Sequence, residues 1–516
     1  MPFKSVWLVT FVIQAFSMLT FFSLWTYPGS DVNLEKQEPE VPIPAYSRKV
    51  DVIQNNIVHC HQDISRDPLS EKCLPSPNLD GTCSIYARGN RKLIQPLRFN
   101  PTGSRKDLKC KLTELVKSCD TLRAAHGYIT NGARVSQEEK EFPLAFSIKL
   151  HKDPEQAEQL LRTIYRPNNV YCLYVDGKAH EIIYNLIMNI SRCFPNVHVI
   201  QERINVIYAS SAHVTSEMQC MRKCAESSVK WKYYINLTGQ EFPLKTNLEI
   251  VRILKSLNGA NDIESYNHPV LQKWRFSKKY RLTKTSNVET TEDKEPFKYK
   301  LQISKGSAYG SFSREFVEFI LNDNIAQDFI SWFNNTYSPE ENVWATLNTL
   351  PWAPGGYETE IRHTFGNFLS RAVIWESDKV KCEGRYVRGV CVFGRKDLTW
   401  LTGRPQLFAN KFNYKMDNVA IDCLEDIIRN RTVSPNIDTL SWYYYRNLPH
   451  AKRYADRSRE VILHEREETK SNWLRDQTSK QADDNNVALP IRNEKSDVLH
   501  VLGGTMTMYK VHGEVL

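Results

Sequence analysis

Short apolar runs alternate with longer amphipathic stretches through the middle of the chain. The stretches carry apolar residues every three to four positions, which is the spacing of a helix that buries one face. This succession predicts strands at 142–150, 169–175, 196–200 and 232–237, with helices at 154–165, 180–192 and 213–229. Strands that alternate with helices form a mostly parallel α/β sheet.

Capping residues support two of the helix starts. Asp153 can cap a helix that begins at Pro154, because proline is favoured at the first helical position. Thr246 and Glu249 have the spacing of a capping box at the start of the amphipathic run at 248–257.

The N-terminal apolar segment has a different character. No charged residue lies between Ser5 and Ser30, and the segment 6–27 is long enough to cross a hydrocarbon core of roughly 30 Å as a helix. Lys4 favours a cytoplasmic N-terminus by the positive-inside rule. The alternative is a cleaved signal peptide, but no small-x-small cleavage site follows a short apolar core. We therefore expect a single-pass type II anchor.

Composition divides the remainder of the chain. Residues 28–125 are rich in proline, charge and cysteine, and the chain becomes polar and dense in charge after residue 432. We expect a cytoplasmic tail at 1–5, an anchor at 6–27, a luminal stem at 28–125, a globular domain at 126–432 and a mobile polar tail at 433–516.

Cysteines and glycosylation sequons fit a luminal domain. None of the 12 cysteines forms a C-x-x-C pair of the kind that binds zinc, so an exported chain would use them as a disulfide framework. The alternative, reduced thiols in a cytosolic protein, conflicts with the N-terminal segment. Sequons at Asn189, Asn334 and Asn430 suit a luminal surface, whereas Asn236 lies in an apolar run and is expected to be buried and unmodified.

Charge excludes little except nucleic acid. The chain has 68 basic and 59 acidic residues, and its formal charge of +9 is spread without a dominant basic block. This balance gives no reason to expect DNA or RNA as a partner, and it does not repel an anionic sugar nucleotide.

Candidate chemistry follows the predicted strands, because ligands of open α/β sheets bind at the carboxyl ends of strands. The residues at these positions are His151 and Lys152, then Asp176, Gly177 and Lys178, then Gly239, Gln240 and Glu241. The chain has no D-x-D triplet and no compact His/Asp/Glu cluster with metal-ligand spacing. A transferase without a metal needs fixed Arg or Lys cations to balance a diphosphate.

Several motifs together carry a family resemblance. The segments are FPLAFSI, YCLYVDGKA, VIYAS, KYYINLTGQEFPLKTN, KGSAY, YSPEENVWAT, CEGRYVRGVCVFG and LFANKF. In this order and spacing, from about 138 to 428, they resemble the core 2/I-branching β-1,6-N-acetylglucosaminyltransferases, glycosyltransferase family 14.

The resemblance implies a metal-independent, GT-A-like catalytic domain at 126–432 in a Golgi membrane protein. It implies inversion at the anomeric carbon as GlcNAc moves from UDP to the 6-hydroxyl of an acceptor sugar, with no metal cofactor. Glu341 matches the catalytic base, and Arg388 and Lys411 match the pair that holds the diphosphate. The remaining expected donor-site residues are His151, Asp176, Lys178 and Tyr208.

The acceptor side matches the family less closely. Glu264, Arg275 and Trp375 fall on family positions that contact the acceptor sugar. Gln272 and Ser377 replace a family lysine and tyrosine, and the loop from 375 to 382 is shortened. The identity of the acceptor is therefore the feature that can least be inferred for this chain from the family.

Disulfide pairs also follow from the resemblance. It implies the pairs Cys119–Cys193, Cys172–Cys220 and Cys382–Cys391. Cys423 should bond to the stem, through Cys60, Cys73, Cys83 or Cys110, and the sequence leaves these four open.

The expected reaction is β-1,6 transfer of GlcNAc to an O-glycan on glycoproteins, such as Galβ1-3GalNAc. Two alternatives stay open: the same fold with UDP-glucose or UDP-xylose as donor, and a sugar-binding relative that has lost its chemistry. A two-carboxylate hydrolase is excluded, because Glu340 and Glu341 are adjacent and cannot flank a glycosidic bond.

Overall fold

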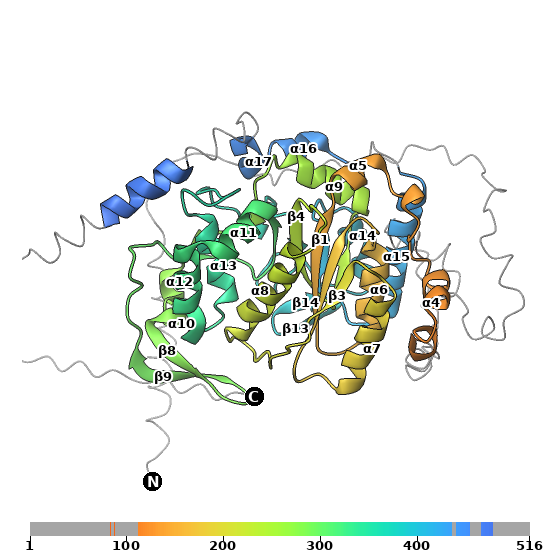
Figure 1. Cartoon of the computed structure of the whole chain (residues 1–516), viewed down its shortest axis with the longest axis horizontal. Helices are drawn as coiled ribbons and strands as arrows, with labels where there is room; N and C mark the ends of the chain where they lie inside the picture. Colours follow the sequence, from red (N-terminus) through yellow and green to blue (C-terminus); the bar gives the residue numbers. More distant parts are fainter. Residues whose placement is uncertain (1–82, 84–86, 88–111, 436–439, 455–465, 478–516) are drawn as a thin grey trace, which may run out of the picture. The chain divides into compact units, whose positions relative to one another are not determined.

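A six-stranded sheet in the order β3-β2-β1-β4-β11-β6 forms the centre of the fold (Figure 1). Its strands are β1 (Leu144–Leu150), β2 (Val170–Val175), β3 (Val197–Val199), β4 (Tyr233–Thr238), β6 (Asp262–Ile263) and β11 (Gly310–Ser313). The first four are parallel, and β11 runs antiparallel to both β4 and β6. The predicted mostly parallel sheet is confirmed, with all four predicted strands in it.

The computed structural model describes Cys83, Ala87 and residues 112–435, 440–454 and 466–477. All of these belong to one unit that extends from Val58 to Leu516. Within the described ranges, no helix has the length and apolar character needed to cross a membrane. The predicted anchor at 6–27 and most of the predicted stem lie outside the described residues.

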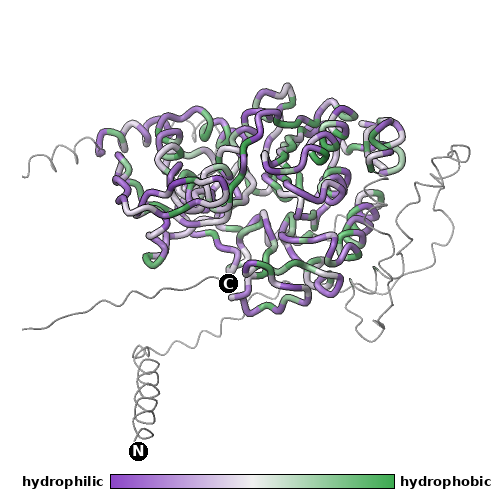
Figure 2. Tube along the Cα trace, turned by 90° about the horizontal axis from the view of Figure 1, so that it is seen from below, coloured by the Kyte–Doolittle hydropathy of each residue, from purple (hydrophilic) through white to green (hydrophobic). Residues whose placement is uncertain are grey.

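Helices cover both faces of the sheet (Figure 1). One face packs against α6 (Pro154–Ile164), α7 (Glu181–Arg192) and α9 (Asn247–Ser256). The other face packs against α8 (Ala212–Ala225), α11 (Arg314–Asn322), α12 (Asn324–Trp332) and α13 (Glu340–Asn348). Hydrophobic stretches recur among hydrophilic ones along the whole described trace, as expected for elements that bury one side (Figure 2).

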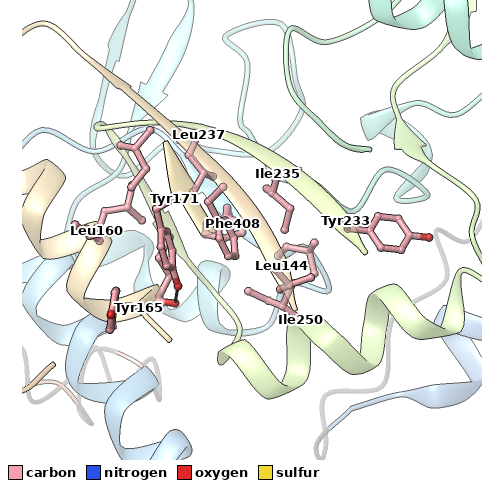
Figure 3. Packing of buried hydrophobic residues seen from close by; sticks show 14 of the residues in the cluster. Leu144, Leu160, Tyr165, Tyr171, Tyr233, Ile235, Leu237, Ile250 and Phe408 are labelled. Atoms are coloured by element: carbon pink, nitrogen blue, oxygen red, sulfur yellow. Dashed lines mark hydrogen bonds between the residues drawn. The ribbon is translucent and has the colours of Figure 1, made fainter. Parts of the chain in front are cut away.

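Alternation along β1 decides which side chain enters which core. Leu144, Phe146 and Ile148 enter the core under α6, α7 and α9, whereas Ala145 enters the core under α8. Figure 3 shows Leu144 beside Ile235 and Ile250, with Phe408 reaching the same cluster from a second sheet. Period-two alternation thus fills two apolar layers from one strand.

The capping predictions had different outcomes. Thr246 and Glu249 form the predicted capping box at the start of α9. Asp153 occupies the N-cap position of α6, with Pro154 in the first turn, but its side chain makes no cap hydrogen bond. Its φ of 51° lies in the left-handed region, so the prediction that Asp153 caps through its side chain is wrong.

A three-stranded sheet in the order β12-β15-β5 lies against the main sheet. Its strands are β5 (Glu241–Pro243), β12 (Arg371–Ala372) and β15 (Phe408–Asn410), and α14 (Leu398–Thr402) and α15 (Asn418–Val433) share its core. Arg371 Nε donates to Glu241 Oε2 at 2.8 Å, and both side chains are fully buried. Glu241, a candidate site residue at the end of β4, is therefore a buried structural partner.

Shorter elements complete the chain. Two-stranded antiparallel sheets pair β7 (Tyr266–Asn267) with β10 (Ser304–Lys305), β8 (Lys278–Leu282) with β9 (Asn287–Asp293), and β13 (Arg385–Val387) with β14 (Val390–Val392). The other helices are α4 (Cys119–Ala125), α5 (Gln137–Glu141), α10 (Trp274–Ser277), α16 (Trp442–Arg446) and α17 (Pro449–Tyr454). Short 3-10 turns occupy Gly132–Arg134, Val270–Gln272, Phe333–Asn335, His363–Phe365 and Arg395–Asp397.

Among the residues that the structure describes, four disulfides join these elements. Three are the pairs implied by the resemblance, Cys119–Cys193, Cys172–Cys220 and Cys382–Cys391. The fourth joins Cys423 to Cys83, which selects one of the four stem candidates.

Part of the segment after residue 432 is core. Leu440, Tyr445, Leu448, Ala451 and Tyr454 are buried in the same cluster as β1 and α9. The prediction of a mobile tail from 433 onwards is thus wrong for 440–454, because aromatic and apolar side chains hidden among the charges complete the core. A further helical stretch, 466–477, places Trp473 against Trp352.

Candidate functional site

Polar side chains gather where β1 and β2 end. The strands are parallel neighbours, so His151 and Lys152 after β1 lie at the same sheet edge as Asp176 and Lys178 after β2. Asp176 is buried, and its Oδ1 accepts hydrogen bonds from the backbone amides of Lys178 at 2.9 Å and Val206 at 3.2 Å. Asp176 therefore fixes two loops at this edge.

Close backbone contact makes the same edge rigid. The Lys178 ammonium donates to Val206 O at 2.6 Å, and Gly177 N donates to Ile204 O at 2.9 Å. A Cβ at Gly177 would lie 2.7 Å from Asn205 Oδ1 and 2.8 Å from the Ile204 carbonyl carbon. Only glycine allows the two loops to approach this closely.

Arg388 is presented at the tip of the β13–β14 hairpin. Arg388 and Gly389 both have positive φ, 54° and 72°, as a two-residue hairpin turn requires. The Arg388 guanidinium lies 5.3 Å from the ring centroid of Tyr208, whose side chain is 63% exposed. Lys411, which directly follows β15, donates to Val387 O at 2.9 Å. Residues far apart in sequence thus meet at one place.

The electrostatics of this region favour an anion. Burial, followed by the charges of Arg388 and Lys152, lowers the pKa of Lys411. Burial and the Lys152 charge also lower the pKa of His151, against the opposing charge of Asp176. Like charges that lie close together repel one another, and an anion that binds among them offsets this repulsion.

Glu341 lies in the first turn of α13, between two cations. Its Oε2 accepts from Arg275 Nη1 at 2.5 Å and lies 2.9 Å from Lys305 Nζ. Oε1 has no hydrogen-bond partner among the residues that the structure describes. Ser338 N donates to Ala209 O at 2.9 Å, which joins the YSPEE segment to the VIYAS segment that carries Tyr208.

The two adjacent carboxyls have opposite protonation behaviour. Burial alone would raise the pKa of Glu341, but the charges of Lys305 and Arg275 outweigh burial and lower that pKa. Burial and the charge of Glu341 raise the pKa of Glu340 to about 8. At neutral pH Glu341 is therefore an ionised carboxylate beside a protonated Glu340.

Glu264 forms a second polar centre with His363. Glu264 Oε1 accepts from His363 Nδ1 at 2.8 Å and from the His363 backbone amide at 3.1 Å. His363 Nε2 lies 3.7 Å from Asp378 Oδ1. Burial alone would lower the pKa of His363, but the hydrogen bond and charge of Glu264, together with Asp378, raise it. Glu264 is thus paired with an imidazole whose charged form it favours.

Trp375 connects the acceptor-side residues to the Arg388 hairpin. It forms an isolated antiparallel bridge with Val390, and Glu376 N donates to Gly389 O at 2.8 Å. Asp378, which contacts His363, also accepts from the Trp375 backbone amide at 2.8 Å. The indole remains 39% exposed and is free to pack on a sugar ring.

Sequence comparison agrees with this geometry. Residues 144–402 match the family model of the Core-2/I-Branching enzyme. This chain belongs to the Core-2/I-branching enzyme family. The resemblance identified from the motifs is confirmed.

Relatives of this branching-enzyme family cover most of the chain. One human relative, beta-1,3-galactosyl-O-glycosyl-glycoprotein beta-1,6-N-acetylglucosaminyltransferase 3, is 34% identical over 366 residues, 68% of this chain and 83% of the relative. Another, human N-acetyllactosaminide beta-1,6-N-acetylglucosaminyl-transferase, is 35% identical over 370 residues, 70% of this chain and 90% of the relative. A sheep relative with the same name as the first is 33% identical over 393 residues, 72% of this chain and 88% of the relative.

The structure gathers the predicted residues in two groups. His151, Asp176, Lys178, Tyr208, Arg388 and Lys411 form the group near the strand ends, and Glu264, Arg275, Trp375 and Glu341, the residues predicted to contact the acceptor or to act as base, form the other. Burial, followed by the charges of Lys149 and Lys178, lowers the pKa of His213 to about 3, against the opposing charge of Glu341.

Sequence reasoning missed three side chains at the site. Lys152 follows the first predicted strand, but no motif there indicates that its charge acts on Lys411 and His151. Lys305 lies in the KGSAY motif, and nothing in that motif indicates that its ammonium contacts Glu341. His363 lies 99 residues from Glu264 and carries no motif at all.

Two further predictions concern metal and glycans. Within the described ranges, no group of three or more His, Cys, Asp or Glu side chains could hold a metal ion.

Asn334 and Asn430 are exposed, and Asn189 is half-buried. Asn236 is buried as predicted, with its amide bonded to Ala308 O and its carbonyl to Gly310 N.

Proposed function

We propose that this chain is an inverting β-1,6-N-acetylglucosaminyltransferase. It transfers GlcNAc from UDP-GlcNAc to the 6-hydroxyl of GalNAc in a core 1 O-glycan. The observation that carries the proposal is the state of Glu341, an ionised carboxylate with Oε2 held by two cations and Oε1 open. Family membership supplies the reaction class.

The chemistry follows from this arrangement. The acceptor O6 attacks the anomeric carbon as the bond from that carbon to the diphosphate oxygen breaks, and Glu341 Oε1 takes the hydroxyl proton. Because the acceptor attacks from the face opposite the departing UDP, the configuration at the anomeric carbon is inverted. UDP leaves with the bonding electron pair, and Arg388 and Lys411 stabilise its charge without a divalent metal.

The acceptor side supports a neutral sugar. Glu341 is paired with Arg275, Glu264 is hydrogen-bonded to His363, and the exposed indole of Trp375 offers an apolar face. Sugar hydroxyls bind to such paired polar groups, and the ring packs on aromatic surface. Gln272 and Ser377 lie where the family has other residues, so acceptor choice must be measured for this chain.

We also propose that the chain is a Golgi membrane protein of type II topology. The apolar segment 6–27 would anchor it, and the four disulfides and exposed sequons suit a luminal domain.

A donor and acceptor screen tests the function. The full chain, in detergent, is assayed for UDP release with UDP-GlcNAc, UDP-glucose and UDP-xylose against core 1 and N-acetyllactosamine acceptors. We expect turnover with UDP-GlcNAc and core 1 and none with Glu341→Gln. Preference for UDP-glucose or UDP-xylose would show that the proposed donor is wrong. No turnover with any pair of donor and acceptor would favour a sugar-binding relative that has lost its chemistry.

A further inference from the structure

Lys305 is an interior lysine that approaches Glu341 from a different strand. Its side chain is only 11% exposed, and its ammonium lies 2.9 Å from Glu341 Oε2. The same ammonium donates to Gly306 O at 3.0 Å. Burying an ammonium is costly unless it is paired, so this contact is part of the folded site rather than a loose surface pair.

Backbone and side-chain hydrogen bonds fix β10 to the first turn of α13. Gly306 N donates to Glu341 O at 2.8 Å, and Asn342 Nδ2 donates to Ser304 O at 2.9 Å. A Cβ at Gly306 would lie 1.8 Å from Glu264 O, so only glycine permits this approach. The residues before and after Lys305 thus hold β10 beside the backbones of Glu264 and Glu341.

Arg275 and Lys305 both contact the same oxygen of Glu341. Arg275 reaches Oε2 from α10, and Lys305 reaches it from β10. Two cations on one oxygen fix the carboxylate plane and leave the other oxygen without a partner among the described residues. A proton acceptor must be held in one geometry to act efficiently.

We propose that Lys305 is a positioning residue for the transfer reaction: with Arg275 it anchors Oε2 of Glu341, so that Oε1 is the oxygen that takes the acceptor proton. The inference rests on the proposed function of Glu341 as the base. Neither the motifs nor the names of the relatives assign this lysine a role.

The groups that face Glu341 allow a clean test by pH. They are Arg275 on α10, Lys305 on β10, Tyr266 on β7, Tyr337 before α13, His213 on α8 and Glu340 on α13 itself. Below pH 7 the two tyrosines are neutral, because burial raises the pKa of Tyr266 to about 12 and also raises the pKa of Tyr337. Burial lowers the pKa of His213 to about 3, and Glu340 is protonated. Of these six groups, Arg275 and Lys305 are then the two that bear charge.

The experiment measures kcat/KM against pH for wild type, Lys305→Met and Lys305→Arg. Glu341 must be ionised to act, and the Lys305 charge lowers its pKa. Removing that charge should move the acidic limb of the profile up by about one pH unit or more. It should also lower the plateau roughly 10-fold, because the carboxylate is less well fixed. Lys305→Arg should restore the limb.

Lys298→Met is the matched control. Lys298 lies seven positions earlier and pairs at 2.6 Å with Asp328, where both side chains are exposed. This variant loses the same charge, so its limb should coincide with that of wild type. Lys305→Gln is the second variant if Lys305→Met does not fold, since glutamine removes the charge but stays polar.

Each outcome decides the proposal. An unshifted limb in Lys305→Met or Lys305→Gln, with UDP affinity retained, would overturn the role of Lys305. An equal shift in Lys298→Met would assign the effect to net charge and also overturn it. Full activity of Glu341→Gln, measured in parallel, would instead defeat the proposed function, so the two failures are distinguishable.

Discussion

The donor side and the acceptor side of this molecule handle charge in opposite ways. Among the described residues, neither Arg388 nor Lys411 forms an ion pair, although both lie near other cations. On the acceptor side, Glu341 is paired with Arg275 and Lys305, and Glu264 is hydrogen-bonded to the His363 imidazole. On the proposed function, the unpaired cations of the donor side would bind a diphosphate, and the paired acidic side chains of the acceptor side would bind neutral hydroxyls.

Of the variants considered, Glu341→Gln should reduce transfer activity the most. Glutamine keeps the shape of the side chain but cannot accept the hydroxyl proton, so kcat should fall by about 10²–10⁴. UDP affinity should stay close to that of wild type, because the donor side is untouched. Steady-state kinetics and calorimetry on one core 1 acceptor measure the two quantities.

Glu340→Gln is the control for that variant. Its carboxyl is protonated at neutral pH, so transfer should change only a few-fold. A dead Glu340→Gln enzyme beside an active Glu341→Gln enzyme would show that the base has been misassigned by one residue.

Arg388→Ala and Lys411→Ala probe the unpaired cations of the donor side. Each should lose about 2–4 kcal/mol of transition-state stabilisation, or roughly 10²–10³ in kcat. Arg385→Ala removes the same charge from the same hairpin and should be far milder. Activity of wild type should also persist in excess chelator, and rescue of a chelated enzyme by Mn²⁺ would contradict the cation clamp.

The two sides also differ in how well sequence predicts them. Donor-side residues follow apolar strands or sit in short motifs, so periodicity and the family resemblance locate Asp176, Arg388 and Lys411. Acceptor-side partners are set by tertiary contacts across long separations, such as the 99 residues between His363 and Glu264. No local pattern encodes such a pair.

The C-terminal segment illustrates the same limit. The chain after residue 432 is dense in charge as a whole and therefore favours a tail, yet Tyr445, Leu448 and Tyr454 complete the core beside α9. Burial of a few aromatic side chains outweighs local polarity. The burial of this segment becomes evident only when the chain is folded around the sheet.

His363→Ala tests acceptor binding without changing the proposed base, Glu341. Losing a charged hydrogen bond to Glu264 should raise the acceptor KM about 10-fold and leave the donor KM unchanged. The pKa of His363 is raised in the folded protein, so its ion pair is present at low pH and is lost as pH rises through that pKa. Acceptor KM of wild type should therefore rise towards alkaline pH, and that of His363→Ala should not. A parallel rise in the variant would assign the effect to another group.

The smallest expected effect is on stability. The folded-state pKa of Glu340 is raised to about 8, above its ordinary value of 4.5, so the folded protein holds a proton that the unfolded chain has released. Its contribution to stability is fully present below pH 4.5 and is lost as pH rises to about 8. Glu340→Gln should raise the Tm by a few degrees at pH 8 relative to wild type, and by less at pH 5. Thermal unfolding at both pH values checks this, and an equal change at both would contradict it.

The configuration of the product tests the central claim most directly. Wild-type protein is incubated with UDP-α-GlcNAc and a core 1 acceptor in excess chelator, and the new linkage is read by NMR. The arrangement of Glu341, Arg388 and Lys411 predicts β-linked GlcNAc on O6 of GalNAc, formed without metal. An α-linked product, or transfer that appears only after Mn²⁺ is added, would contradict it.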